Sequence, residues 1–226
     1  MVCAFIVMKC ERFSQITDLK DYLENNRLIA HYCGFNIMKP LPSYWTYDRF
    51  LKEVDNGELK NIMAQQVKKL YELGIVDASF IGLDSTPVAA NTKQNNPKSF
   101  AKDKFKPENH PKADPDCALG VHSASNQHNE RRYEFYWGYK NHVLVDCISG
   151  LPLYELTTPA NVADSSVVQN ILAAANKTLP LQECTFLGDK GYDVKAIYDL
   201  VKNVYQGDAV IPLNKRNTKD PEKLPA

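Results

Sequence analysis

The sequence predicts an α/β protein in which a helical amino-terminal region precedes a mixed sheet flanked by helices. Residues 14–75 place many apolar side chains at helical spacing. From residue 79 onward, short apolar runs end in acids or turn residues, which is typical of buried strands. Helical segments separate the later runs, as in domains that pack helices on a sheet. We therefore expect a helical region over 1–76 and a sheet domain over 77–226.

The amino-terminal region reads as several helices. Thr17 or Asp18 can cap the first, and prolines at 40 and 42 end it. Thr46 can cap the next. A longer helix then ends at Gly74 and carries one apolar face, formed by Leu59, Ile62, Met63, Val67, Leu70 and Tyr71. Its lysines lie largely off that face, so the region is either a module that binds DNA ends or a plain bundle with a solvated basic face.

The first strand is expected at residues 79–84, an apolar run that ends in Asp84. A loop-like segment follows over 91–130. Its part from Asn91 to Lys112 contains six lysines against Asp103 and Glu108. Four prolines prevent continuous regular structure there. Such a long connection tends to be functional or disordered, so it either gathers phosphates or is a solvated surface loop.

An α/β pattern fills the rest of the chain. Residues 133–146 and 151–157 predict a hairpin around the Ser149-Gly150 turn. Asp164 is expected to cap a helix, and residues 183–189 form a second short apolar strand that ends in an acid. Asp193 is then expected to cap another helix. The last strand is expected at 208–213.

Composition excludes several classes of protein. Twenty-seven basic residues balance 27 acidic ones, which excludes a uniformly basic nucleic-acid coat but not local patches. The longest apolar run, residues 4–8, is far shorter than the roughly 20 residues that span a bilayer, and it lacks the flanks of a signal peptide. We therefore expect a cytoplasmic protein with no membrane partner. The six cysteines match no zinc-finger spacing and are expected to be free thiols.

Two acids carry the chemistry that this pattern suggests. Asp84 and Asp189 each stand at the carboxyl end of a short buried strand, where sites gather in open sheets. If the strands are neighbours, the carboxylates converge and repel each other unless a cation lies between them. Oxygen ligands of this kind suit Mg²⁺ or Mn²⁺. The alternative is that each aspartate is simply a turn residue after a strand.

Five short motifs follow one another in this part of the chain. They are Gly82-Leu83-Asp84-Ser85-Thr86, Lys112-Ala113-Asp114-Pro115-Asp116, Gly138-Tyr139-Lys140-Asn141-His142, Thr158-Pro159-Ala160-Asn161-Val162-Ala163-Asp164 and Gly188-Asp189-Lys190-Gly191-Tyr192-Asp193. Together they closely resemble the DDE transposases of bacterial and archaeal insertion sequences, of the "transposase IS four" type. The resemblance covers about residues 79–216, and the preceding helical region resembles the amino-terminal part of that family.

The resemblance implies an RNase H-like catalytic core in which Asp84 is the first catalytic acid and Asp189 the second. Both would be ligands of Mg²⁺ or Mn²⁺, with a pair of ions in a complete site. The implied reaction is cleavage at a transposon end, which frees a 3′-hydroxyl that attacks a target phosphodiester. The implied partners are double-stranded DNA, as transposon ends and target, and a second copy of the chain in a synaptic complex.

The resemblance also implies a third acid, a glutamate within a Tyr-Arg-Glu-Lys pattern on a later helix. Glu222 lies beside a proline and lacks those neighbours, so we reject it as that ligand. We therefore expect a truncated or frameshifted transposase that is weakly active or inactive alone. Two other functions stay open, a non-catalytic DNA-binding remnant and another RNase H-like nuclease.

Basic residues near the motifs are candidate DNA contacts: Lys140, His142, Lys190, Lys215 and Arg216. A lysine at such a place contacts a phosphate as a point charge and does not read the base sequence. For His142 the alternative is a hydrogen bond in the core beside Asp146.

Overall fold

The computed structural model describes residues 1–99, 103–125 and 131–214. The chain divides into two compact units, Met1–Asn61 and Ile62–Ala226. The division falls inside a helix and earlier than the boundary expected after residue 76. Each unit has a hydrophobic core of its own.

The first unit is helical, as expected. Its helices are α1 (Val2–Cys10), α2 (Ile16–Asn25), α3 (Arg27–Tyr32), α4 (Tyr44–Glu53) and the first turns of α5 (Asn56–Glu72). Their apolar faces meet in one cluster of buried side chains, formed by Ala4, Met8, Leu19, Leu23, Ala30, Cys33 and Tyr47. The sequence analysis missed α1, whose residues are apolar nearly all round and so show no helical period.

The expected helix ends are partly right. The first predicted helix is in fact two, α2 and α3, which part at Asn26; α3 already ends at Tyr32, so Pro40 and Pro42 lie in the non-helical segment 33–43 but do not end the helix. Gly74, at φ +67°, follows α5 as predicted. The expected caps are wrong, since α2 begins after Gln15 and α4 after Ser43, in both cases without a side-chain cap.

The second half of α5 belongs to the larger unit. Val67 is almost fully buried in the core of that unit, and Met63, Leu70 and Tyr71 pack against the same core. The apolar face predicted for this helix therefore joins the sheet domain. This burial is the physical reason why the division of the chain precedes residue 76.

The larger unit is built on a mixed sheet that, among the described residues, has six strands. They are β1 (Phe80–Ala89), β2 (Ala118–Ser125), β3 (Arg131–Asp146), β4 (Pro152–Pro159), β5 (Thr185–Leu187) and β6 (Asp208–Val210). The order is β2-β3-β1-β5-β6. β4 lies outside this order and pairs antiparallel with residues 139–145 of β3. β1 runs antiparallel to β3 and parallel to β5, and β5 runs parallel to β6.

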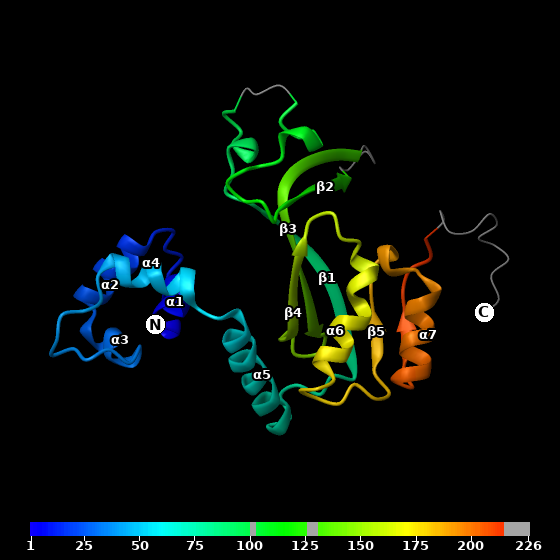
Figure 1. Ribbon diagram of the computed structural model, residues 1–226. Helices are drawn as coiled ribbons and strands as arrows, with labels where there is room; N and C mark the ends of the chain where they lie inside the picture. The colour runs from blue at the N-terminus through cyan, green and yellow to red at the C-terminus, as the bar shows by residue number, and fades with distance from the viewer. Residues whose placement is uncertain (100–102, 126–130, 215–226) are drawn as a thin grey trace. The chain divides into compact units, whose positions relative to one another are not determined.

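Helices α6 (Val168–Ala175) and α7 (Lys195–Val204) pack with the sheet in one core (Figure 1). That core takes Ile81 and Leu83 from β1, Leu144 from β3 and Phe186 from β5. The expected mixed sheet with flanking helices is confirmed, whereas the RNase H-like type stays a prediction. The expected caps Asp164 and Asp193 are wrong, because α6 begins after the short 3₁₀ helix η3 (Asp164–Val167) and α7 begins after Val194.

The connection between β1 and β2 is ordered over its described residues. It contains two 3₁₀ turns, η1 (Lys93–Asn95) and η2 (Pro107–Asn109), and has a small core of its own around Ala90, Cys117 and Trp137. We call residues 90–99, 103–125 and 131–139 the insertion module. It stands above the rest of the sheet in Figure 1, in green.

Among the described residues, no helix is both long enough and apolar enough to cross a bilayer. The six cysteines are free thiols, three of them buried.

Candidate functional site

One predicted acid, Asp84, lies within β1, and the other, Asp189, comes two residues after the end of β5. The two strands pair in parallel with Gly82 opposite Leu187, so each acid follows this pair by two residues along the chain. Asp84 does not end its strand as expected, because β1 continues to Ala89 in its pairing with β3. Both acids line one pocket of about 380 Å³.

The floor of this pocket is apolar and comes from three strands. Its other lining residues are Gly82, Leu83, Thr86, Val143, Val145, Leu187 and Gly188. Val143 is the cross-strand partner of Asp84 and therefore shares its face. The two acids are exposed, so the pocket is a shallow apolar basin with carboxylates on its rim.

Local backbone geometry orients each acid. The Oδ1 atom of Asp84 accepts a hydrogen bond from the backbone N–H of Ser85 at 2.7 Å. The Oδ1 atom of Asp189 accepts one from the backbone N–H of Gly191 at 2.8 Å and caps the 3₁₀ turn η4 (Lys190–Tyr192). For neither acid does Oδ2 have a hydrogen-bond partner among the described residues.

Tyr192, which the sequence analysis did not single out, supports the turn that carries Asp189. Its ring is buried and contacts Phe186 edge-on, with the ring centroids 6.2 Å apart. Burial raises the pKa of Tyr192, and the charges of Asp164, Asp84 and Asp189 raise it further, so the phenol stays neutral. The signal that could have found it is its place in the motif Gly188–Asp193.

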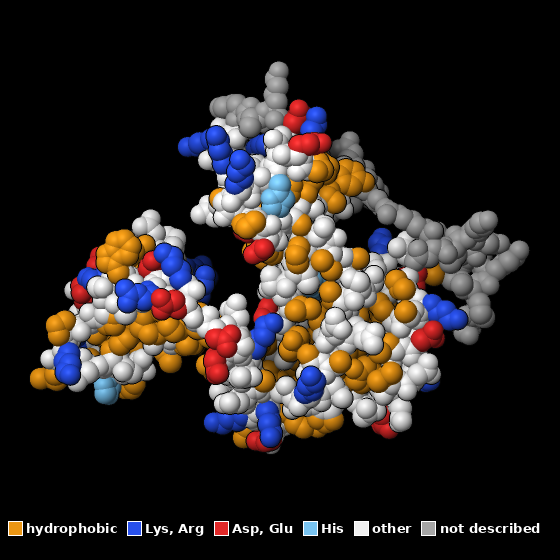
Figure 2. Space-filling model, in the orientation of Figure 1, with side chains coloured by type: hydrophobic (Ala, Val, Ile, Leu, Met, Phe, Trp, Pro, Cys, Tyr) orange, Lys and Arg blue, Asp and Glu red, His pale blue; other side chains and the backbone are white. Residues whose placement is uncertain are grey.

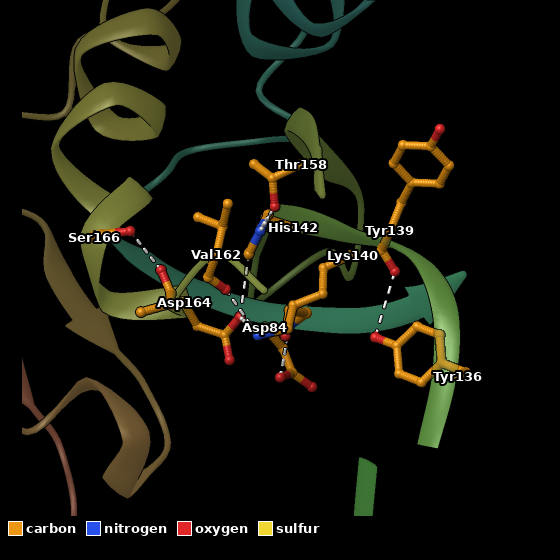
Figure 3. Close-up of polar contacts among 11 residues, drawn as sticks. Asp84, Tyr136, Tyr139, Lys140, His142, Thr158, Val162, Asp164 and Ser166 are labelled. Atoms are coloured by element: carbon orange, nitrogen blue, oxygen red, sulfur yellow. Dashed lines mark hydrogen bonds and ion pairs between the residues drawn. The ribbon is translucent and has the colours of Figure 1, made fainter. Parts of the chain in front are cut away.

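Lys140 and His142 are engaged inside the protein (Figure 3). The Lys140 ammonium donates hydrogen bonds to the carbonyl of Val162 at 2.9 Å and to Asp164 Oδ1 at 3.0 Å. His142 is completely buried, and its Nε2 lies 2.9 Å from Thr158 Oγ1. Both residues alternate along β3 with Val143 and so belong to the face opposite Asp84.

These contacts change the interpretation of three residues. A direct DNA contact by His142 is contradicted, because its side chain has no exposed surface; the core alternative holds, with Thr158 and not Asp146 as partner. Lys140 holds the turn before α6 onto β3 with two of its three N–H donors, so a phosphate contact through the third stays a prediction. Asp164 is the acceptor of this lysine and not a helix cap.

Residues 68–224 match the family model of the transposase DDE domain. The chain belongs to this family. The resemblance to DDE transposases is thereby confirmed, whereas the narrower insertion-sequence type remains a prediction. No curated protein matches the chain.

Solved structures of transposases also align with the chain. The piggyBac transposase synaptic complex with hairpin DNA is 10% identical, with a TM-score of 0.46, over 98% of this chain and 43% of that one. The Mos1 paired-end complex with a left transposon end is 13% identical, with a TM-score of 0.31, over 91% of this chain and 56% of that one. The chain thus spans about half the length of these transposases.

The donor set of the pocket suits a hard divalent cation. Two carboxylates on the rim present oxygen ligands, which Mg²⁺ and Mn²⁺ prefer. Among the described residues, no cluster of three or more acidic, histidine or cysteine side chains could hold a metal. Glu222, already rejected as a third ligand, lies outside the described residues.

The remaining basic candidates differ in what the structure says of them. Lys190 follows Asp189 directly and is exposed, so a phosphate contact by its side chain stays a prediction. Its backbone carbonyl accepts a hydrogen bond from the side chain of Asn214 at 3.2 Å, which ties η4 to the segment after β6. Lys215 and Arg216 lie outside the described residues.

Proposed function

We propose that this chain carries the DNA-cutting and strand-joining site of a DNA transposase, with Asp84 and Asp189 as catalytic metal ligands. One observation supports the proposal: Asp84 on β1 and Asp189 just after the parallel strand β5 line the same open pocket. Divalent ions held there, a pair in a complete site, would activate the attacking oxygen and stabilise the leaving one.

The residues of the chain itself supply position. The amide groups of Ser85 and Gly191 each hold one oxygen of an acid, which leaves the second oxygen for a cation. Lys190, which follows Asp189 in the chain and is exposed, would neutralise a phosphate of the DNA backbone. The open shape of the pocket suits a rod-like substrate that lies across it better than a small molecule that needs enclosure.

We further propose double-stranded DNA as partner, both as transposon ends and as target, with two copies of the chain in a synaptic complex. The chain would act in the cytoplasm on chromosomal DNA. The structures that align with it include a piggyBac synaptic complex with hairpin DNA and a Mos1 mariner paired-end complex with Mn. Family membership supports extending DNA as partner to this chain.

A second candidate function is a DNA-binding remnant without catalysis. The observation in its favour is that only two carboxylates of the described residues meet at the pocket. Such a site would hold a second ion loosely, because Mg²⁺ demands a full set of oxygen ligands.

The test measures Mn²⁺ binding by titration calorimetry and strand transfer with pre-cut transposon ends. Asp84→Asn and Asp189→Asn should each weaken Mn²⁺ binding at least about tenfold and lower joining at least about a hundredfold, because each removes a charged ligand. Asp199→Asn, an exposed acid on α7, is the control and should match the parent. Metal binding without joining would favour the remnant. Equal Mn²⁺ affinity in all variants would contradict the assignment of both acids.

A further inference from the structure

The insertion module presents its aromatic side chains on the same face of the sheet as Asp84. Val143 pairs with Asp84 and shares its face. Counting back along β3 in steps of two residues gives Tyr139, Trp137, Phe135 and Tyr133 on that face. One continuous strand therefore connects the acid pocket to a row of aromatic rings.

The inner part of this row is covered and rigidly held. The Trp137 indole N–H donates to the carbonyl of Lys104 at 2.9 Å, and the ring of His110 meets it edge-on at 5.0 Å. The side chain of Asn95 accepts from the backbone N–H of Trp137 at 2.9 Å and donates to its carbonyl at 2.7 Å. These contacts place the connection between β1 and β2 on the part of β3 that precedes the pocket residues Val143 and Val145.

The outer part of the row is open to solvent. Tyr133 is 57% exposed, Phe135 50% and Val121, the cross-strand partner of Phe135, 51%. The ring of Phe105 stacks beside Phe135 with centroids 6.4 Å apart and planes inclined by 30°. Large apolar side chains that gather on a surface in this way mark a binding site.

Lysines lie on the same module as this aromatic patch, one of them at its edge. The Lys104 ammonium lies 5.2 Å from the centroid of the Phe105 ring. Lys93, Lys98 and Lys112 are exposed and form no ion pair with a described residue. Figure 2 shows basic side chains and a hydrophobic patch together on this part of the surface.

The module also carries acids. Asp114 accepts a hydrogen bond from the Tyr139 hydroxyl at 2.6 Å, and Asp103 pairs with Lys106 at 3.2 Å. Glu108, Asp116 and Glu134 are exposed as well, so any contact to a phosphate would come from individual lysines and not from a net positive field.

We propose that the insertion module holds an unpaired DNA strand that leads to the acid pocket along β3, with bases stacked on Phe135 and Tyr133 and phosphates on the lysines. Exposed rings together with lysines are the combination that binds single strands, because every base has a π face and every nucleotide a phosphate. A duplex keeps its bases stacked inside and would use only the lysines. An apolar protein surface would use only the rings. The inference rests on the proposed function, since the strand is the one to be cut or joined.

The test uses the full chain and fluorescence anisotropy with a labelled oligothymidylate and a duplex of equal length. Phe135→Ala and Tyr133→Ala should each weaken single-strand binding about tenfold and leave duplex binding within about twofold, because stacking contributes only when bases are free. Phe135→Trp should restore binding. Phe80→Ala, an exposed ring on the same sheet beyond the pocket, is the matched control.

A second measurement separates the charges from the rings. Replacing Lys93, Lys98 and Lys112 together by glutamine should lower the slope of log affinity against log salt by about 2 for the single strand. The two alanine variants should keep the parent slope. Circular dichroism confirms that each variant is folded.

Three outcomes would overturn the proposal. Single-strand binding by the double variant Tyr133→Ala/Phe135→Ala at parent strength would exclude stacking. An equal loss of duplex binding would show a general DNA contact. Self-association of the parent that Phe135→Ala abolishes, with DNA binding unchanged, would make the patch a contact between copies. Asp84→Asn should bind the single strand like the parent, so failure of the acid assignment would appear only in cleavage and joining.

Discussion

At the scale of single residues, the site depends on which polar atoms the protein uses itself. Asp84 and Asp189 each accept a hydrogen bond from a backbone N–H with one carboxylate oxygen, whereas Lys140 forms an ion pair with Asp164. Sequence patterns found the acids because each ends an apolar run. They could not show that Lys140 is engaged, since Asp164 lies on another element and only the fold brings the two together.

His142 gives a prediction about pH at this scale. Burial lowers its pKa, although the nearby Asp164 charge opposes this and Lys140 adds to it. As the pH falls, His142 is therefore protonated in the unfolded chain before it is protonated in the folded one. The contribution of His142 to the free energy of unfolding should fall as the pH drops below about 6.5 and stay level above it. His142→Gln, which cannot titrate, should lose this dependence.

The measurement is the urea midpoint of unfolding at pH 7.5 and 5.5, for the parent and for His142→Gln. His122, which is exposed, serves as control through His122→Gln. A parent whose midpoint shifts no more than that of His142→Gln would show that His142 does not protonate in this range.

At the scale of elements, two features differ from their sequence pattern. Helix α1 has no helical period because both its faces are apolar. The lysine-rich connection, expected to be functional or disordered, is folded over its described residues around a small core at Trp137. Prolines do prevent regular structure there, but side-chain hydrogen bonds from Asn95 replace it, and a single asparagine gives no such signal in sequence.

Gly138 gives a prediction at the element scale. A Cβ atom at this position would lie 2.1 Å from the carbonyl oxygen of Val88, near the end of the antiparallel pairing of β3 with β1. Since that obstacle is backbone, Gly138→Ala should force the strands apart and destabilise the larger unit by about 1–3 kcal/mol. Ala89→Ser, at the exposed cross-strand partner, is the control and should stay within about 0.5 kcal/mol.

Chemical denaturation monitored by tryptophan fluorescence measures both variants, because Trp137 is next to the substitution. A Gly138→Ala protein as stable as the parent would mean that the two strands pair differently from this register.

At the scale of the whole molecule, two cores lie on one chain, and α5 contributes to both units. The boundary expected at 76 came from the end of a helical pattern. The burial of Val67 in the larger core moves the division back to residue 61. A helix pattern shows which of its faces is apolar but not which core receives that face.

Substitutions in the two cores should therefore act on different unfolding transitions. Leu23→Ala, in the core of the first unit, should destabilise that unit by about 2–5 kcal/mol. Val67→Ala should destabilise the larger unit by a smaller amount, about 1–3 kcal/mol, because it removes less buried volume. Hydrogen exchange followed by mass spectrometry assigns each loss of protection to its unit. Loss of protection confined to residues 1–61 in Val67→Ala would contradict the division.

The sequence by itself determined the elements that carry the acids, the order of the motifs and membership of the transposase DDE family, because apolar period and short motifs are local properties. Only the tertiary structure decided that β1 and β5 pair in parallel, with Asp84 and Asp189 lining one pocket, and that Lys140 and His142 face the core. The pairing of strands and the face on which a side chain lies depend on which apolar faces are buried together. Residues far apart along the chain determine that burial together, so no local pattern shows it.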